Sequence, residues 1–127
     1  MGLPLIGENY KSEKEMKLYL NKILPNQGYK DNGRYEWLNG MELDRYYPKL
    51  KLAFEYHGEQ HFHDREFFKV NLEEIKKRDK LKRELCRDQG VILIEISYLE
   101  KISEVLLLNK LGDFNIQTIQ DKLIKRN

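Results

Sequence analysis

The run Val91–Ser97, VILIEIS, constrains the fold most, because it is almost continuously apolar and rich in β-branched residues. Such a run predicts a central strand that is covered on both faces. A helical pattern over residues 71–88 separates it from another strand candidate at 51–57. Strand, helix and strand make a βαβ unit, so we expect two parallel strands joined by a right-handed crossover.

The rest of the chain predicts one helix before this unit and further helices after it. Ser12 and Glu15 form a capping box, so a helix is expected over residues 12–24, where Pro25 ends it. An Asn-Gly turn at 39–40 separates two more strand candidates. These other elements are strands at 34–38 and 41–47 and helices at 99–111 and 115–124.

The resulting order, α-β-β-β-α-β-α-α, predicts an α/β or α+β fold, with a mixed sheet of about four strands and helices on both faces. The 127 residues suit a single domain over 1–127, with a core at 12–97 and C-terminal helices at 99–125. No run reaches the roughly 18 apolar residues of a membrane span. The single cysteine, Cys86, excludes an internal disulfide and suits a reducing compartment, so we expect an intracellular, cytoplasmic protein.

Positive charge gathers on the helix expected at 71–88, although the net charge of the chain is only +2. Residues 69–87 hold eight basic and four acidic side chains, a local charge of +4. A basic element on a near-neutral body could contact phosphate groups. The alternative is a solvated helix face with Glu–Lys pairs. The candidate DNA-binding residues are Lys76, Lys77, Arg78, Lys80, Lys82 and Arg83.

Two acidic residues, Asp44 and Glu55, flank the turn between the strands expected at 41–47 and 51–57. If residues 48–51 form a four-residue loop, alternation along the strands places the two side chains directly opposite one another. Opposed side chains have Cβ atoms about 4.5–5.5 Å apart, where like charges destabilise unless something neutralises them. A divalent cation would do so, whereas the alternative is two solvent-facing acids compensated by lysines.

Three histidines follow these acids closely, at His57, His61 and His63. His57 shares the face of Glu55 by parity, and His61 lies on a segment that could curl back over the same site. Imidazole serves as a general acid or base near neutral pH. A zinc site built from the three histidines and Cys86 is an alternative, although the spacing matches no closed structural zinc pattern.

Taken together, these features resemble the PD-(D/E)XK nuclease superfamily. The resemblance is closest to the branch of very-short-patch-repair mismatch endonucleases and related phage homing endonucleases, whose pattern is written EDxHD. It covers about residues 12–97. The matching residues are Glu15, then Glu42-Leu43-Asp44, Phe54-Glu55-Tyr56-His57-Gly58, His61-Phe62, Arg78-Asp79 and the strand that begins Gly90-Val91.

The resemblance implies a restriction-endonuclease-like core and a metal-dependent endonuclease of bacterial or phage type, with DNA as partner and Mg²⁺ or Mn²⁺ as cofactor. Asp44 would be the principal metal ligand and Glu55 the second acid. His61 would activate or position the attacking water, and Asp79 would orient a histidine or a metal-bound water. Glu15 would reach the site from the first helix and hold a metal-bound water.

The chain departs from the superfamily pattern at His57, which stands where a lysine is usual, two residues after the acid. Stabilisation of charge at the scissile phosphate would then come from His57 itself, from His61 or from Lys82. Gln60 is a further candidate, because amide side chains sometimes occupy that region in the superfamily.

Simpler explanations stay open for several features. A capping box accounts for Glu15 without a catalytic role, and Asp79 could pair with Arg83 one helical turn later. The departure at His57 leaves open a non-catalytic nucleic-acid-binding module that retains the nuclease fold. A third alternative is an interaction domain, with the apolar segment Val105–Leu111 as the surface for a homodimer or a larger partner protein.

Overall fold

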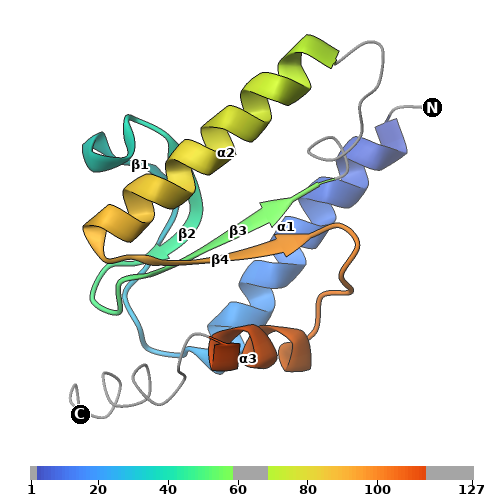
Figure 1. Ribbon diagram of the computed structural model, residues 1–127. Helices are drawn as coiled ribbons and strands as arrows, with labels where there is room; N and C mark the ends of the chain where they lie inside the picture. Colours follow the sequence, from blue (N-terminus) through green and yellow to red (C-terminus); the bar gives the residue numbers. More distant parts are fainter. Residues whose placement is uncertain (1–2, 59–68, 114–127) are drawn as a thin grey trace.

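The computed structural model describes residues 3–58 and 69–113 and shows a mixed sheet with helices on both faces (Figure 1). The elements are α1 (Leu3–Ile23), β1 (Lys30–Arg34), the 3-10 turn η1 (Glu36–Leu38), β2 (Glu42–Tyr47), β3 (Leu52–His57), α2 (Lys69–Gln89), β4 (Ile92–Ser97) and α3 (Glu104–Asp113). The four strands lie in the order β1-β2-β3-β4, with β1–β2 and β2–β3 antiparallel and β3–β4 parallel. The expected mixed sheet and its parallel βαβ unit are therefore confirmed.

Strand β4 lies at the edge of this four-stranded sheet, so its predicted central position is wrong. Its apolar sequence instead reflects helices that cover both of its faces. Ile94 and Ile96 pack in one core cluster, and Val91 and Leu93 contribute to the other. A strand with both faces buried has an apolar sequence whether or not another strand pairs with each of its edges.

Three predicted boundaries are also wrong. Helix α1 begins at Leu3, so Ser12 lies inside it and no capping box forms at 12–15. The first strand ends at Arg34, because the segment from Glu36 to Leu38 turns into a 3-10 helix that buries Leu38. Helix α3 begins at Glu104 instead of residue 99, with the Ser103 hydroxyl accepting the N–H of Leu106 at 3.0 Å, a typical N-terminal cap. The helix expected at 115–124 lies outside the described residues.

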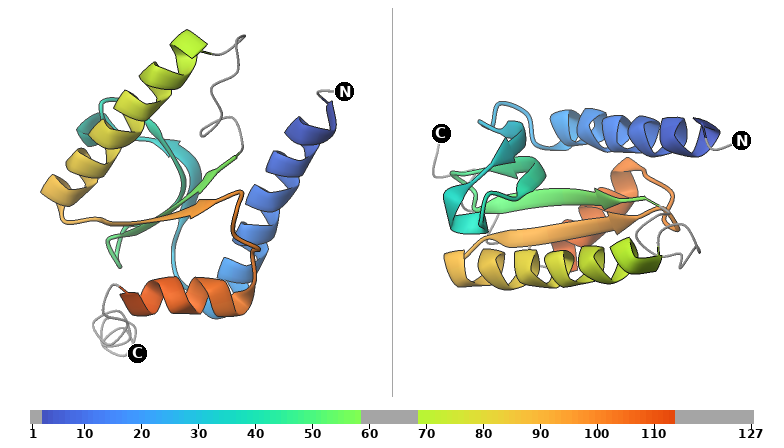
Figure 2. Two further views of the ribbon diagram at one scale, coloured as in Figure 1. Left: turned by 45° about the vertical axis from the view of Figure 1, so that its right-hand side comes forward. Right: turned by 90° about the horizontal axis from the view of Figure 1, so that it is seen from above.

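The core is divided by the sheet into two clusters, and Figure 2 shows α1 and α2 on opposite sides of the strands. The larger cluster joins α1 and α3 to one face of the sheet, with Met16, Leu20 and Phe54 fully buried. The smaller cluster joins α2 and η1 to the other face and includes Leu38 and Cys86. The polar site described below lies between α1 and α2 and is lined by side chains from the middle of both helices.

Arg45 is a buried charge that connects three elements around the first cluster; only 2% of it is exposed. Its guanidinium forms a fork with Asp31 on β1, at 2.6 and 2.9 Å. It also donates to the side-chain oxygen of Asn21 at 2.6 Å and the carbonyl of Lys17 at 3.2 Å, both on α1. The face of Tyr29 lies 3.7 Å from the guanidinium carbon. Arg45 therefore fixes α1 against β1 and β2.

The α3 segment predicted as a partner surface is divided between core and solvent. Leu107 and Leu111 are buried in the first cluster, whereas Val105 is 65% and Leu108 40% exposed. Leu99, on the preceding loop, is also exposed. In the part of the chain that the structure describes, no helix combines the length and apolarity needed to cross a membrane.

Candidate functional site

The two acids predicted to oppose each other, Asp44 and Glu55, lie where the β2–β3 hairpin opens. A four-residue loop connects the strands and Arg45 pairs with Phe54, so one further step in this register places Asp44 opposite Glu55, as predicted. Asp44 accepts the N–H of Tyr56 at 2.7 Å, and the N–H of Asp44 donates to Glu55 at 3.2 Å. Each carboxylate thus bonds the backbone of the facing strand.

These carboxylates are buried, with 8% of Asp44 and 5% of Glu55 exposed, so the solvent-facing alternative is excluded. Burial, and then the negative charge of Glu55, raise the pKa of Asp44 to about 8. Burial also raises the pKa of Glu55, although the ammonium of Lys82 opposes that shift. Two close buried acids resist ionising together, and a cation placed between them relieves that cost.

Lys82 supplies a positive charge to this pair from α2. Its ammonium forms an ion pair with Glu55 and donates to the carbonyl oxygen of Glu42 at 2.7 Å. The Lys82 side chain is only 14% exposed, which distinguishes it from the solvated lysines of the same helix. Strand β3 has no lysine two residues after Glu55, and the lysine against this acid, Lys82, comes from α2 instead.

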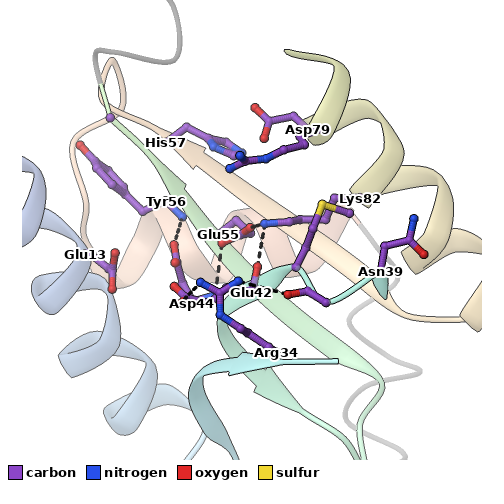
Figure 3. Close-up of a pocket in the computed structure, with 14 residues that line it drawn as sticks. Glu13, Arg34, Asn39, Glu42, Asp44, Glu55, Tyr56, His57, Asp79 and Lys82 are labelled. Atoms are coloured by element: carbon purple, nitrogen blue, oxygen red, sulfur yellow. Dashed lines mark hydrogen bonds and ion pairs between the residues drawn. The ribbon is translucent and has the colours of Figure 1, made fainter. Parts of the chain in front are cut away.

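A pocket of about 670 Å³ opens beside the acid pair, between α1 and α2 (Figure 3). Its acidic lining includes Glu13 from α1 and Asp79 from α2, in addition to the hairpin acids. Positive charge comes from Arg34 on β1 and from Arg78 and Lys82 on α2. Acids that can hold a cation thus lie together with bases that can hold an anion.

The acid of α1 that lines the pocket is Glu13, and Glu15, predicted to reach the site from this helix, does not line it. Glu13 lines the pocket and lies close enough to Asp44 to raise its pKa, whereas Glu15 is exposed and lies outside the lining. Two residues along a helix rotate the side chain by about 200°. The signal was present in the sequence, because Glu13 lies one turn before Met16 and two turns before Leu20, which are both buried.

His57 is buried, lines the pocket and bonds a residue that sequence reasoning missed. Its Nε2 lies 2.8 Å from a carboxylate oxygen of Glu95 on β4, and Arg83 of α2 holds that carboxylate at 2.7 and 3.0 Å. The available signal was Glu95 itself, a lone charge inside an apolar strand. Arg83, a predicted DNA contact, forms an ion pair with Glu95, and Asp79 lines the pocket.

The other basic residues of α2 separate into two groups. Arg78 and Lys82 reach the pocket, whereas Lys76, Lys77 and Lys80 are exposed elsewhere on the helix. The exposure of these three lysines agrees equally with a phosphate-contacting surface and with a solvated helix face that has no binding role. His61, Gln60 and His63 lie outside the described residues.

The donor set fits a magnesium-like ion better than zinc. Asp44 and Glu55 offer hard oxygen ligands, and Mg²⁺ commonly binds one or two carboxylates while keeping several waters. Within residues 3–58 and 69–113, no three or more His, Cys, Asp or Glu side chains converge on a common point as a ready metal cage. Cys86 is 1% exposed in the second core cluster, and burial raises its pKa to about 11, which disfavours the thiolate that zinc requires.

Removing the charge of Asp44 is expected to stabilise the metal-free protein in alkaline solution. The folded-state pKa is raised to about 8, so the folded chain keeps a proton that the unfolded chain releases, and stability falls as the pH rises toward 8. The free energy of unfolding of Asp44→Asn should therefore exceed that of wild type by at least about 1 kcal/mol at pH 9. This difference should vanish near pH 4. Urea unfolding in EDTA measures this, and a variant less stable than wild type at pH 9 would contradict it.

Comparison with known proteins finds similarity to segments of viral proteins. The chain is 40% identical over 70 residues to uncharacterized protein 033L of Invertebrate iridescent virus 3 and 45% identical over 74 residues to uncharacterized protein 307L of Invertebrate iridescent virus 6. It is 39% identical over 75 residues to uncharacterized protein 094L of Frog virus 3 (isolate Goorha). The matches cover 53%, 56% and 56% of this chain but 36%, 38% and 45% of the relatives, respectively. No family model and no solved structure matches the chain, so the similarity found is to uncharacterized viral proteins over less than half of their length.

Proposed function

We propose that this protein is a metal-dependent DNA endonuclease with a restriction-endonuclease-like core, which hydrolyses phosphodiester bonds at the pocket between α1 and α2. The observation that carries the proposal is the buried, opposed pair Asp44 and Glu55 with the Lys82 ammonium against it. Such a pair is costly for folding alone, because burial raises both pKa values. Carboxylates with strongly shifted pKa values that line a concave polar site are typical of functional sites.

In this proposal each side chain takes a role that suits its position. Asp44 and Glu55 would hold Mg²⁺ or Mn²⁺, and the bound ion supplies neutralisation of the phosphoryl oxygens and a source of nucleophilic water. Lys82 can donate to a non-bridging phosphate oxygen while it stays beside Glu55. Arg78, at the pocket lining, would hold a flanking phosphate without reading sequence.

One observation favours a second candidate, a nucleic-acid-binding module without catalysis. The Lys82 ammonium already neutralises part of the charge that a metal would neutralise, and the described residues offer only two opposed carboxylates as a ligand core. Such a module would keep Lys82 and Arg78 for phosphate binding and would bind no divalent ion.

Titration calorimetry with Mg²⁺ and Mn²⁺, combined with a plasmid nicking assay, separates the two candidates. If the protein is an endonuclease, it should bind Mg²⁺ or Mn²⁺, and Asp44→Asn should abolish this binding. It should also nick supercoiled plasmid with either ion but not in EDTA. The module should bind DNA with no metal uptake and no nicking. Plasmid that stays supercoiled with every metal, in protein that binds DNA, would reject the endonuclease.

Lys82→Met should lower the rate constant of cleavage by about 100-fold, because a single preorganised donor to the transition state contributes about this much. Methionine keeps the length of the side chain but removes its charge. Lys80→Met on the exposed side of the same helix is the matched control and should raise KM with kcat nearly unchanged. Single-turnover cleavage of a labelled duplex measures both. Equal kcat values for the two variants would show that Lys82 acts only as one more surface charge.

A further inference from the structure

Glu95 is a charged residue on β4, and the proposed mechanism gives it no role. It lies on an otherwise apolar strand, and its carboxylate reaches across the parallel β3–β4 pair to His57 instead of turning to solvent. In the strand register Glu95 is level with Glu55, and His57 is level with Ser97, so the contact runs diagonally. The Glu95 side chain is 24% exposed.

The contacts of Glu95 keep it ionised. Burial alone would raise its pKa, but the hydrogen bonds from His57 and Arg83 outweigh burial and lower the pKa to about 2. Arg83 binds both carboxylate oxygens, at 2.7 and 3.0 Å, in the forked geometry that only a guanidinium provides. The carboxylate is therefore held in one orientation and can only accept hydrogen bonds.

An acceptor-only partner decides the chemistry of the imidazole. Because Glu95 cannot donate, the 2.8 Å contact requires the proton of the ring to be on Nε2 of His57. In the neutral ring Nδ1 is then the nitrogen with the lone pair. His57 is itself 7% exposed, with Nδ1 buried, and it lines the pocket, so the ring is held beside the pocket in one tautomer and one orientation.

We infer that Glu95, anchored by Arg83, is a positioning residue that fixes the Nε2–H tautomer of His57 at the pocket and thereby supports phosphodiester hydrolysis there. The inference rests on the proposed function. It gives a physical reason why a histidine can stand at the position where the superfamily carries a lysine. The histidine brings a partner from the next strand that sets its hydrogen-bonding pattern.

The substitution Glu95→Gln tests this inference, because glutamine keeps the volume but can donate as well as accept. Long-range ¹H–¹⁵N spectra of the imidazoles, with the His57 signals identified by their loss in His57→Gln, report the tautomer without any substrate. Wild type should show the Nε2–H form and Glu95→Gln a mixture. In the same variant kcat for plasmid cleavage should fall about 10- to 100-fold with KM unchanged, as when a residue that orients a functional histidine is removed.

Glu104→Gln is the matched control, since it removes the carboxylate of an exposed ion pair with Lys22 outside the pocket. It should leave the tautomer and the kinetics unchanged. An Nδ1–H ring in wild type, or a Glu95→Gln variant with wild-type kcat, would overturn the inference. A wild type that shows the Nε2–H form but cuts no DNA would instead overturn the proposed function, and the role in hydrolysis with it, while the tautomer assignment stood.

Discussion

Asp44→Asn protein is expected to lose Mg²⁺-dependent plasmid cleavage by at least about 10³-fold, which corresponds to about 4 kcal/mol of transition-state stabilisation. Asparagine keeps the side-chain oxygen that accepts the N–H of Tyr56 at 2.7 Å, so the hairpin can retain its shape. What it removes is the negative charge that would bind the metal. The loss should appear in kcat measured by single-turnover cleavage, and Glu55→Gln should show a loss of similar size.

Asp88→Asn is the matched control for this prediction. Asp88→Asn is the same chemical change near the far end of α2. The Asp88 side chain is 68% exposed, and the contact that the change would weaken is a long one, at 3.5 Å to Arg87. It should cleave at the wild-type rate. Full nicking by Asp44→Asn would refute the mechanism, whatever the other variants do.

The stability of the same variant makes the result decisive. A buried structural acid normally stabilises the fold, and its replacement lowers stability and activity together. At this site the raised pKa of Asp44 predicts the opposite for stability, a gain in alkaline solution without metal. Loss of cleavage combined with a more stable fold would show that Asp44 serves a function at a cost to folding, the relation expected at active sites.

Local rules were enough to predict the parts of the fold and site that depend on neighbours in the chain. The Pro48 turn fixed the loop length and hence the register that opposes Asp44 and Glu55. Alternation placed His57 beside Glu55 on one face. The pattern of the helix before β4 gave the parallel unit, because parallel strands need a crossover of that length.

The remaining features depend on contacts between elements, which local patterns do not contain. The buried face of α1, with Met16 and Leu20, decides that Glu13 and not Glu15 lines the pocket, and a cap at Ser12 carries no information about that face. Among the lysines of α2, only the packing of the helix on the sheet selects Lys82. The edge position of β4 could not be predicted from its sequence, because the apolar composition of the strand reflects the helices packed on its two faces and not the number of neighbouring strands.

Arg45 is the clearest case of a residue that the sequence could not reveal, and its replacement is expected to have the largest effect on stability. Arg45→Met should lower the free energy of unfolding by about 3–5 kcal/mol, the usual cost of removing one partner from a buried ion pair. Asp31 would lose both bonds of its fork, and Asn21 and the Lys17 carbonyl would lose a donor. Urea unfolding at neutral pH, followed by circular dichroism, measures the change.

Two further variants show whether this energy belongs to the network or to a charge as such. Arg34→Met removes an arginine from the neighbouring strand. Its side chain is 70% exposed, its ion pair with Glu42 is long at 3.8 Å, and its hydrogen bond to the Gly40 carbonyl, at 3.1 Å, is exposed, so the change should cost less than about 1 kcal/mol. Asp31→Leu combined with Arg45→Met should recover part of the loss, because Asp31, whose side chain is 32% exposed, would otherwise be left half-buried without its partner. If Arg45→Met and Arg34→Met unfolded at the same urea concentration, the attachment of α1 to the sheet would have to be assigned to apolar packing alone.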